Sequence, residues 1–244
     1  ATAICAAILL ASASTPAMSQ QRSNRALATV ITAYEQTARR YDPLTSASEG
    51  DRAALRVLPD SSRESDMRQR AELVALKARL ERVPTRGLNE EDALNRAYLM
   101  RVIDQSIQGI DLDFGRAPIS NGDGYFTFGD YLAYTTPIQS VDDAEAWLSR
   151  LSALPAMYRQ SVANARRGIE TGYTQPRIIV DRALATARAQ VATMEQTLLT
   201  PLASMPDTIP AAQQEEFRNR ARTIIRDQIL PVHRETVTFI ESEY

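Results

Sequence analysis

The stretch PRIIVDRALATARAQVATMEQTLL, residues 176–199, decides the fold class. Its apolar residues recur at intervals of three and four, which places them along one side of an α-helix. Such a helix is stable only when its apolar side packs against a neighbouring element. The apolar positions are Val180, Leu184, Ala187, Val191, Met194 and Leu198.

The same spacing recurs along most of the chain. It is found in residues 27–41, 73–83, 99–114 and 158–169. Each segment predicts one amphipathic helix, and helices joined by short loops pack as antiparallel neighbours. The sequence therefore predicts an all-α fold, a multi-helix antiparallel array of about seven main helices over residues 20–244 with one irregular aromatic-rich loop.

Helix boundaries are marked by capping residues. Ser61 and Ser140 each precede an acid by three residues, the spacing of a capping box. Asn89 stands before three acidic residues, which suits a helix N-terminus. Gly115 stands where a C-terminal cap is expected. Pro231 falls inside the last helical pattern, which should kink or restart there.

Two segments are predicted to lie outside the helices. Residues 41–60 mix proline, serine and glycine and predict a surface loop. Residues 115–137 contain the turn signal Asn-Gly-Asp-Gly and predict a short hairpin or irregular extended chain. This second segment either lines a substrate channel or packs a loop onto the core. Its five aromatic candidates for the channel wall are Tyr125, Phe126, Phe128, Tyr131 and Tyr134.

The first residues are typical of a secretory signal peptide. Residues 1–13 are apolar and small, too short for a membrane span, and small residues follow at 17–19. We expect a signal peptide over residues 1–19, cleavage between Ala13 and Gln20, a periplasmic or secreted protein, and no membrane span after cleavage. Cys5 is the only cysteine, so removal of the signal leaves no thiol for a disulfide or a metal.

The charge pattern argues against nucleic acid as a partner. The chain carries 28 basic and 30 acidic residues, a formal net charge of −2. A nucleic-acid-binding surface needs a basic stripe or patch, and no such cluster stands out in the sequence.

No catalytic or metal-binding motif is complete. His233 is the only histidine, so neither a His-Glu-x-x-His zinc site nor a serine triad can form around a second one. A packing or surface histidine is the simpler interpretation. The acidic residues near Asn121 fail the calcium-loop pattern, because Tyr125 and Phe126 occupy the fifth and sixth positions. We expect no catalytic residue, no metal and no cofactor in this chain.

The stretch PIQSVDDAEAWLSRL, residues 137–151, resembles a recurring segment of a bacterial family, domain of unknown function 885. The resemblance runs from about Arg40 to Tyr244 and is clearest between Pro137 and Arg182. Further matching motifs follow in the family's order: Leu154-Pro155, Gly168-Ile169, Gly172, Pro176-Arg177, Ile229-Leu230-Pro231 and Phe239-Ile240-Glu241.

The resemblance implies a longer, helical, exported protein that looks like a zinc metallopeptidase. The family's His-Glu motif and a further histidine lie in the C-terminal half, and none of them maps onto this chain. The apolar stripe through Val237, Ile240 and Tyr244 continues to the last residue, so we expect a chain truncated at 244. One hypothesis is the non-catalytic N-terminal half of a zinc-dependent peptidase, whose partners are its C-terminal half and a peptide substrate. The alternative is a helical periplasmic binding or interaction module without enzymatic activity.

Overall fold

The computed structural model describes residues 24–244. The predicted signal peptide and Cys5 lie outside these residues. Within them the fold is all-α, as predicted, and seven helices have 13 residues or more. They are α1 (Arg25–Tyr41), α3 (Arg63–Glu81), α4 (Glu90–Leu112), α6 (Val141–Glu170), α7 (Arg177–Leu199), α8 (Ala211–Ile224) and α9 (Leu230–Ser242).

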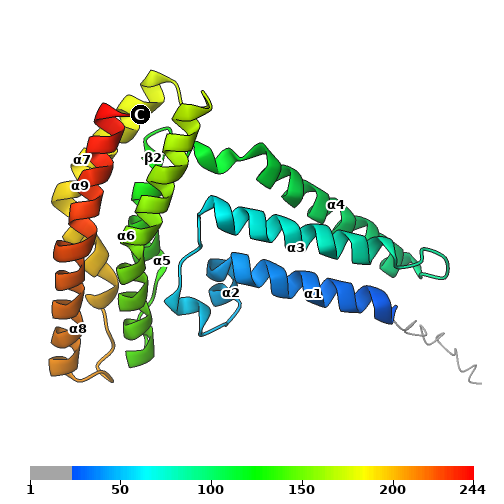
Figure 1. Ribbon diagram of the computed structural model, residues 1–244. Helices are drawn as coiled ribbons and strands as arrows, with labels where there is room; N and C mark the ends of the chain where they lie inside the picture. Colours follow the sequence, from blue (N-terminus) through cyan, green and yellow to red (C-terminus); the bar gives the residue numbers. More distant parts are fainter. Residues whose placement is uncertain (1–23) are drawn as a thin grey trace, which may run out of the picture.

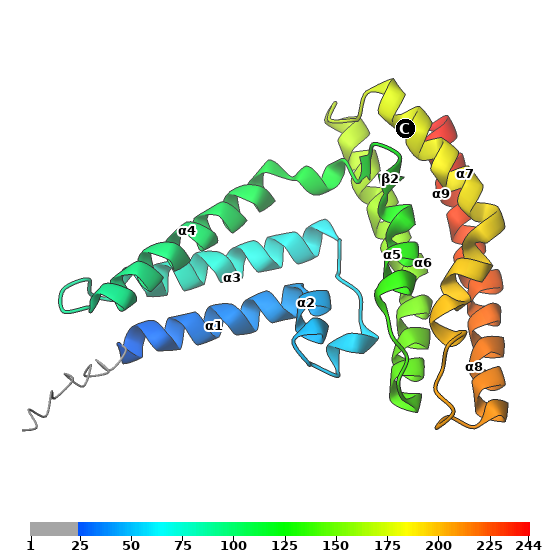
Figure 2. The same ribbon diagram turned by 180° about the vertical axis from the view of Figure 1, so that it is seen from behind.

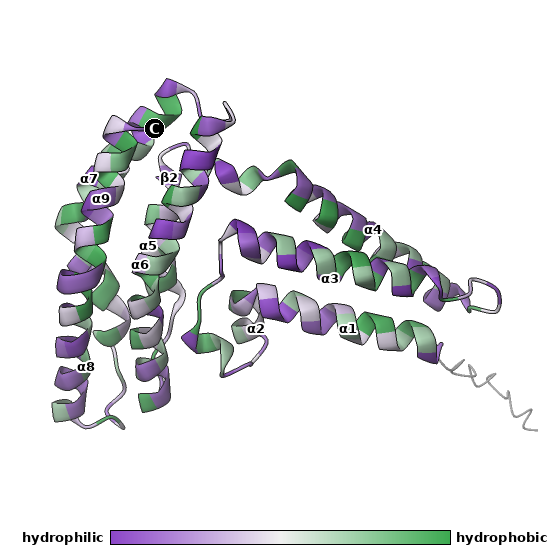
Figure 3. Cartoon of the chain, in the orientation of Figure 1, coloured by the Kyte–Doolittle hydropathy of each residue, from purple (hydrophilic) through white to green (hydrophobic). Residues whose placement is uncertain are grey.

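Helices α1, α3 and α4 form an antiparallel three-helix arm that projects from the rest of the molecule (Figure 1). Its own apolar core is centred on Leu27, Leu73, Leu80 and Ile103, which are all almost completely buried. Apolar and polar residues share each long helix, as the hydropathy colouring in Figure 3 shows. We call this unit, residues 24–112, the arm.

Helices α5 (Phe128–Thr135) to α9 form a second unit, the bundle (Figure 2). Helices α6, α7 and α8–α9 alternate in direction around a larger apolar core that contains Trp147, Leu151, Leu154 and Tyr158. No helix of the described part is both long and apolar enough to cross a membrane.

The arm and the bundle meet along α6 through polar and apolar contacts. The 3₁₀ turns η1 (Ala54–Arg56) and η2 (Phe114–Arg116) pack against this helix. Asn164 of α6 donates to the carbonyl oxygen of Ser61 at 2.7 Å. The Arg167 guanidinium binds Asp113 through two hydrogen bonds of 3.0 and 2.8 Å. These polar contacts, the polar seam, are accompanied by Leu44 and Leu58, which pack against the apolar core of the bundle.

The predicted capping residues are only partly right. Ser140 and Asn89 cap α6 and α4 as expected. The prediction for Ser61 is wrong by one position, because Ser62 accepts from the Ser65 amide and α3 begins at Arg63. The prediction for Gly115 is also wrong: Asp113 ends α4 in the left-handed conformation, with φ of 51°.

The two predicted loops contain more helix than expected. Residues 41–60 include α2 (Pro43–Ser48), capped by Asp42, so the surface-loop prediction is wrong there. The aromatic-rich segment does form the expected short hairpin, β1 (Ile119–Ser120) with β2 (Asp123–Gly124). After the 3₁₀ turn η3 (Tyr125–Thr127), however, the segment becomes the helix α5.

Pro231 does not break the last helix. Helix α8 continues into a π-helical segment, η5 (Ile225–Ile229), and then into α9, which has Pro231 in its first turn. A proline inside an α-helix removes a hydrogen bond and crowds the preceding turn. The π segment lies where that disturbance falls and absorbs it, so the helix continues past Pro231 without the kink or restart that the sequence predicted (Figure 1).

Candidate functional site

A cleft of about 640 Å³ lies where the arm meets the bundle. The arm and its connection supply Tyr41, Asp60 and Asp66, and the bundle supplies aromatic side chains around α5. A concave site that combines aromatic rings with polar groups is a common form of ligand-binding pocket. We call it the junction cleft.

The hairpin and η3 hold the aromatic wall in place. The Tyr125 ring stands edge-on to Phe126 and Tyr158, with ring centroids 5.7 and 5.9 Å away. The buried Tyr158 hydroxyl donates to the Phe126 carbonyl oxygen at 3.0 Å and so ties η3 to α6. Phe128 and Tyr131, one turn apart on α5, lie with centroids 6.3 Å apart. The wall is therefore anchored to the bundle core.

The structure divides the five aromatic candidates. Tyr125, Phe128 and Tyr131 line the junction cleft. Phe126 is fully buried in the bundle core. Tyr134 is 74% exposed and lines a different, shallower pocket beside the end of α7. One part of this segment thus lines a cleft and another part packs into the core.

The charged side chains that line the junction cleft are all acidic: Asp60, Asp66 and Asp123. Burial raises the pKa of Asp66, and Arg63, whose guanidinium lies 3.8 Å away, opposes that rise. Burial also acts to raise the pKa of Asp60, but hydrogen bonds from Ser62 and Arg68 hold it below its ordinary value. The cleft therefore presents carboxylates beside aromatic rings, a combination that favours cationic groups.

The polar seam under the cleft should weaken in acid. The Arg167 guanidinium, hydrogen-bonded to Asp113, holds the pKa of that carboxyl below its ordinary value of 3.8. A depressed folded-state pKa contributes stability in full above the unfolded value, and the contribution is lost as the pH falls through the folded value. We expect Asp113→Asn to lower the free energy of unfolding by about 1 kcal/mol at neutral pH.

This difference between the wild type and Asp113→Asn should shrink as the pH falls below about 4 and vanish in strong acid, once the Asp113 carboxyl is protonated in the folded protein. Urea unfolding followed by circular dichroism over this pH range measures it. A difference that persists unchanged in strong acid would contradict the assignment.

Comparison with protein families gives a match. The model of the family described as "Bacterial protein of unknown function (DUF885)" matches residues 43–244. The chain belongs to this family. The match begins in α2 and includes every residue that lines the junction cleft except Tyr41. No curated protein matches the sequence.

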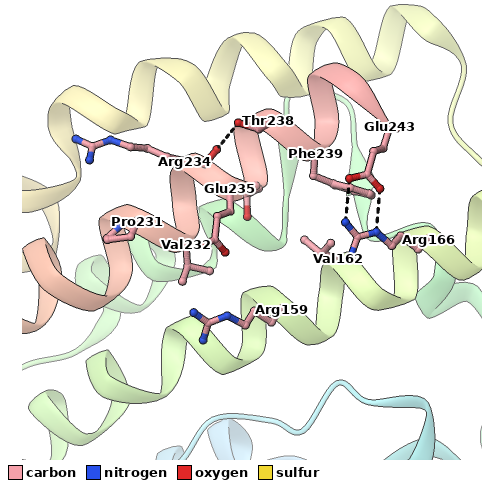
Figure 4. A pocket seen from close by; sticks show the side chains of 11 residues that line it. Arg159, Val162, Arg166, Pro231, Val232, Arg234, Glu235, Thr238, Phe239 and Glu243 are labelled. Carbon is pink, nitrogen blue, oxygen red and sulfur yellow. Dashed lines mark hydrogen bonds and ion pairs between the residues drawn. The ribbon is translucent and has the colours of Figure 1, made fainter.

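A second groove of the DUF885 chain lies between α6 and α9 and holds about 670 Å³ (Figure 4). At one end Arg166 and Glu243 form two hydrogen bonds of 2.9 Å. Arg159 of α6 and Glu235 of α9 line the same groove as exposed side chains. Exposed charges are well hydrated and contribute little to recognition. The groove is slightly larger than the junction cleft, but its chemistry is less specific.

The donor set of the described residues does not fit zinc. They contain no group of three histidine, cysteine or carboxylate side chains placed to hold a metal ion. His233 is fully buried in the bundle, and its Nε2 lies 2.7 Å from the Ala187 carbonyl oxygen. Burial lowers the pKa of this imidazole. Of the two simpler interpretations of His233, packing and surface, the structure shows packing.

Proposed function

We propose that this DUF885 chain is the non-catalytic, substrate-binding N-terminal half of an exported, zinc-dependent, peptidase-like protein. The junction cleft would hold part of a peptide substrate. The observation that carries the proposal is the cleft itself, which Tyr125, Phe128 and Tyr131 line together with Asp60 and Asp66.

Peptide chemistry matches this lining. Aromatic rings make large contact areas with apolar side chains and with the peptide backbone. Carboxylates in a partly buried cleft bind ammonium and guanidinium groups more strongly than they do in water. A peptide with both apolar and basic side chains therefore finds a partner for each group in the junction cleft.

Hydrolysis is assigned to other residues of the longer protein. The resemblance places the zinc-binding His-Glu motif in a C-terminal half, and the described residues of this chain offer no set that fits zinc. Export rests on the signal-like residues 1–19. This chain would therefore bind the peptide substrate, and the C-terminal half, its partner, would carry out catalysis.

The alternative, a periplasmic binding module without chemistry, uses the same cleft. The two proposals differ in what the longer gene product does. Under the first, the gene product with the His-Glu motif cleaves peptides, and a chelator abolishes the cleavage. Under the second, peptides bind and no cleavage occurs.

Replacing aromatic residues of the cleft should weaken peptide binding. We expect Phe128→Ala and Tyr131→Ala each to raise the dissociation constant of a hexapeptide containing lysine and leucine about tenfold. Each change removes a ring that lines the cleft. Calorimetric titration of the purified chain with this peptide is the measurement.

Tyr134→Ala is the matched control, because Tyr134 lies on the same helix and outside the cleft. Its peptide affinity should equal that of the wild type. If all three variants bind alike, or the wild type binds no peptide, the cleft is not the binding site.

A further inference from the structure

One arginine of α6 is buried without a carboxylate partner. Arg150 is only 5% exposed. Its Nη2 donates to the Ala54 carbonyl oxygen at 3.2 Å, and its Nε is buried without a hydrogen-bond partner among the described residues. A buried guanidinium normally pairs with an anion, because removing its charge from water is otherwise costly.

The one carboxylate that lines the same pocket does not compensate Arg150. Asp143 lies in the same region, but it is bound by Arg52 at 2.7 Å and by the Ser140 hydroxyl at 2.8 Å. Burial lowers the pKa of Arg150, and no carboxylate of the described residues raises it again. The positive charge is thus left without a partner inside the described part of the chain.

Arg150 lines a pocket of about 480 Å³, which we call the Arg150 pocket. Its apolar walls include Leu55, Leu132 and Trp147, and the ion-paired side chains of Arg52 and Asp143 also line it. Gln139 and Thr135 add polar groups to the lining. A pocket with apolar walls and one buried guanidinium that has no carboxylate partner suits an organic anion with an apolar body. A planar carboxylate fits the guanidinium fork through two parallel hydrogen bonds.

The Arg150 pocket adjoins the junction cleft. Tyr131 lines both of them and is 59% exposed. A single extended ligand can therefore pass over this ring from one pocket to the other. Its cationic or apolar portion would lie beside Tyr125 and Asp66, and its anionic end would lie beside Arg150.

We propose that Arg150 binds the C-terminal carboxylate of a peptide, whose last side chain fills the apolar Arg150 pocket. The inference rests on the proposed function in taking the ligand to be a peptide. That the ligand carries a carboxylate is inferred from Arg150 alone. It assigns a direction to the bound peptide: the C-terminus lies at α6 and the preceding residues lie over Tyr131 in the junction cleft.

The test uses N-acetyl-leucine as the probe and its amide as the neutral match. Trp147, the only tryptophan of the chain, lines the pocket, so its fluorescence reports binding. We expect the acid to bind saturably and the amide to bind about tenfold or more weakly, because it loses the charge-assisted hydrogen bonds. Inorganic phosphate should compete poorly.

Two substitutions connect the effect to Arg150. Arg150→Met should abolish binding of the acid, and Arg150→Lys should restore it only in part, because lysine keeps the charge and lacks the fork. Arg159→Met is the control: this exposed arginine of the same helix lines the α6/α9 groove, and its replacement should leave binding of the acid unchanged. Circular dichroism verifies that each variant is folded.

Several outcomes would overturn the inference. They are equal binding of the acid and the amide to the wild type, undiminished binding by folded Arg150→Met, and phosphate binding as tight as that of the acid. The comparison of the acid with the amide needs no variant, so a misfolded Arg150→Met leaves the test intact.

The inference and the proposed function fail separately. If the hexapeptide binds through Phe128 and Tyr131 but amidation of its C-terminus has no effect, the peptide proposal holds and the role of Arg150 is refuted. If binding of N-acetyl-leucine requires Arg150 while Phe128→Ala and Tyr131→Ala leave peptide binding unchanged, the role of Arg150 holds and the proposal of a peptide in the junction cleft is refuted.

Discussion

Trp147→Ala should lower the free energy of unfolding by about 4 kcal/mol, the largest effect that we expect from a single substitution. The indole is 1% exposed and lies in the apolar core of the bundle. Its Nε1 donates to the Leu198 carbonyl oxygen at 3.2 Å, at the C-terminal end of α7. The substitution therefore opens a cavity, leaves a buried carbonyl oxygen unpaired and loosens α6 from α7.

Urea unfolding followed by far-ultraviolet circular dichroism measures this loss, because the variant has no tryptophan fluorescence. Trp147→Phe keeps an apolar ring and should lose clearly less. Tyr134→Ala removes an exposed ring and should change the stability by no more than about 0.5 kcal/mol. A loss below about 1.5 kcal/mol for Trp147→Ala would show that the core collapses around the site.

Gly168→Ala should lower the free energy of unfolding by about 3 kcal/mol, although alanine normally stabilises a helix. A Cβ atom at Gly168 would overlap the carbonyl oxygen of Arg116 and lie 2.8 Å from that of Tyr173. Both are backbone atoms, so η2 and the chain after α6 would have to move away from the helix. The substitution would therefore weaken the packing of η2 on α6, where the arm meets the bundle.

Gly109→Ala is the matched comparison, because Gly109 also lies inside a helix, α4, and nothing lies within 4 Å of its would-be Cβ. We expect it to raise the free energy of unfolding by about 1 kcal/mol. Opposite signs for the two substitutions are the expected result in urea unfolding. A stabilised Gly168→Ala would mean that η2 does not pack on α6 as described.

The helices could be predicted because each carries its own apolar stripe. In α7 the expected positions Val180, Ala187, Met194 and Leu198 are buried, whereas Leu184 and Val191 are only partly buried. Spacing identifies the side of the helix that is covered. It does not identify how completely each position is covered, which depends on neighbours that are distant in sequence.

The aromatic candidates show the limit of local reasoning. Five aromatic rings within ten residues indicated a segment with its own role. Which of these rings line the cleft and which are buried depends on how α5 is placed and turned. Tyr131 and Tyr134 are one turn apart and still lie in different pockets. Only the placement of α5 against the arm decides which ring enters the cleft.

The charged residues of the two pockets carried no signal in the sequence. Asp60 and Asp66 flank the start of α3, where acidic residues commonly favour the helix dipole. Arg150 follows a serine on an amphipathic helix, a pattern typical of a solvated position. Its importance comes from burial beneath η1, and that contact joins residues 96 positions apart in the chain.

The π-helical segment has a consequence for the geometry of the whole α8–α9 helix. Five buried residues follow one another along this helix at a constant interval of four: Phe217, Ala221, Ile225, Ile229 and His233. In a regular α-helix each such interval overshoots a full turn by about 40°, so four of them would rotate the buried side by roughly 160°.

A wider turn takes up an additional residue and cancels part of that rotation. The segment η5 thus rotates α9 relative to α8, so that the same side of this long helix faces the core before and after Pro231. The length of this segment is therefore fixed by the residues of α9 that must face the core. One residue fewer between 225 and 229 would leave α8 in place and would turn His233 away from Ala187.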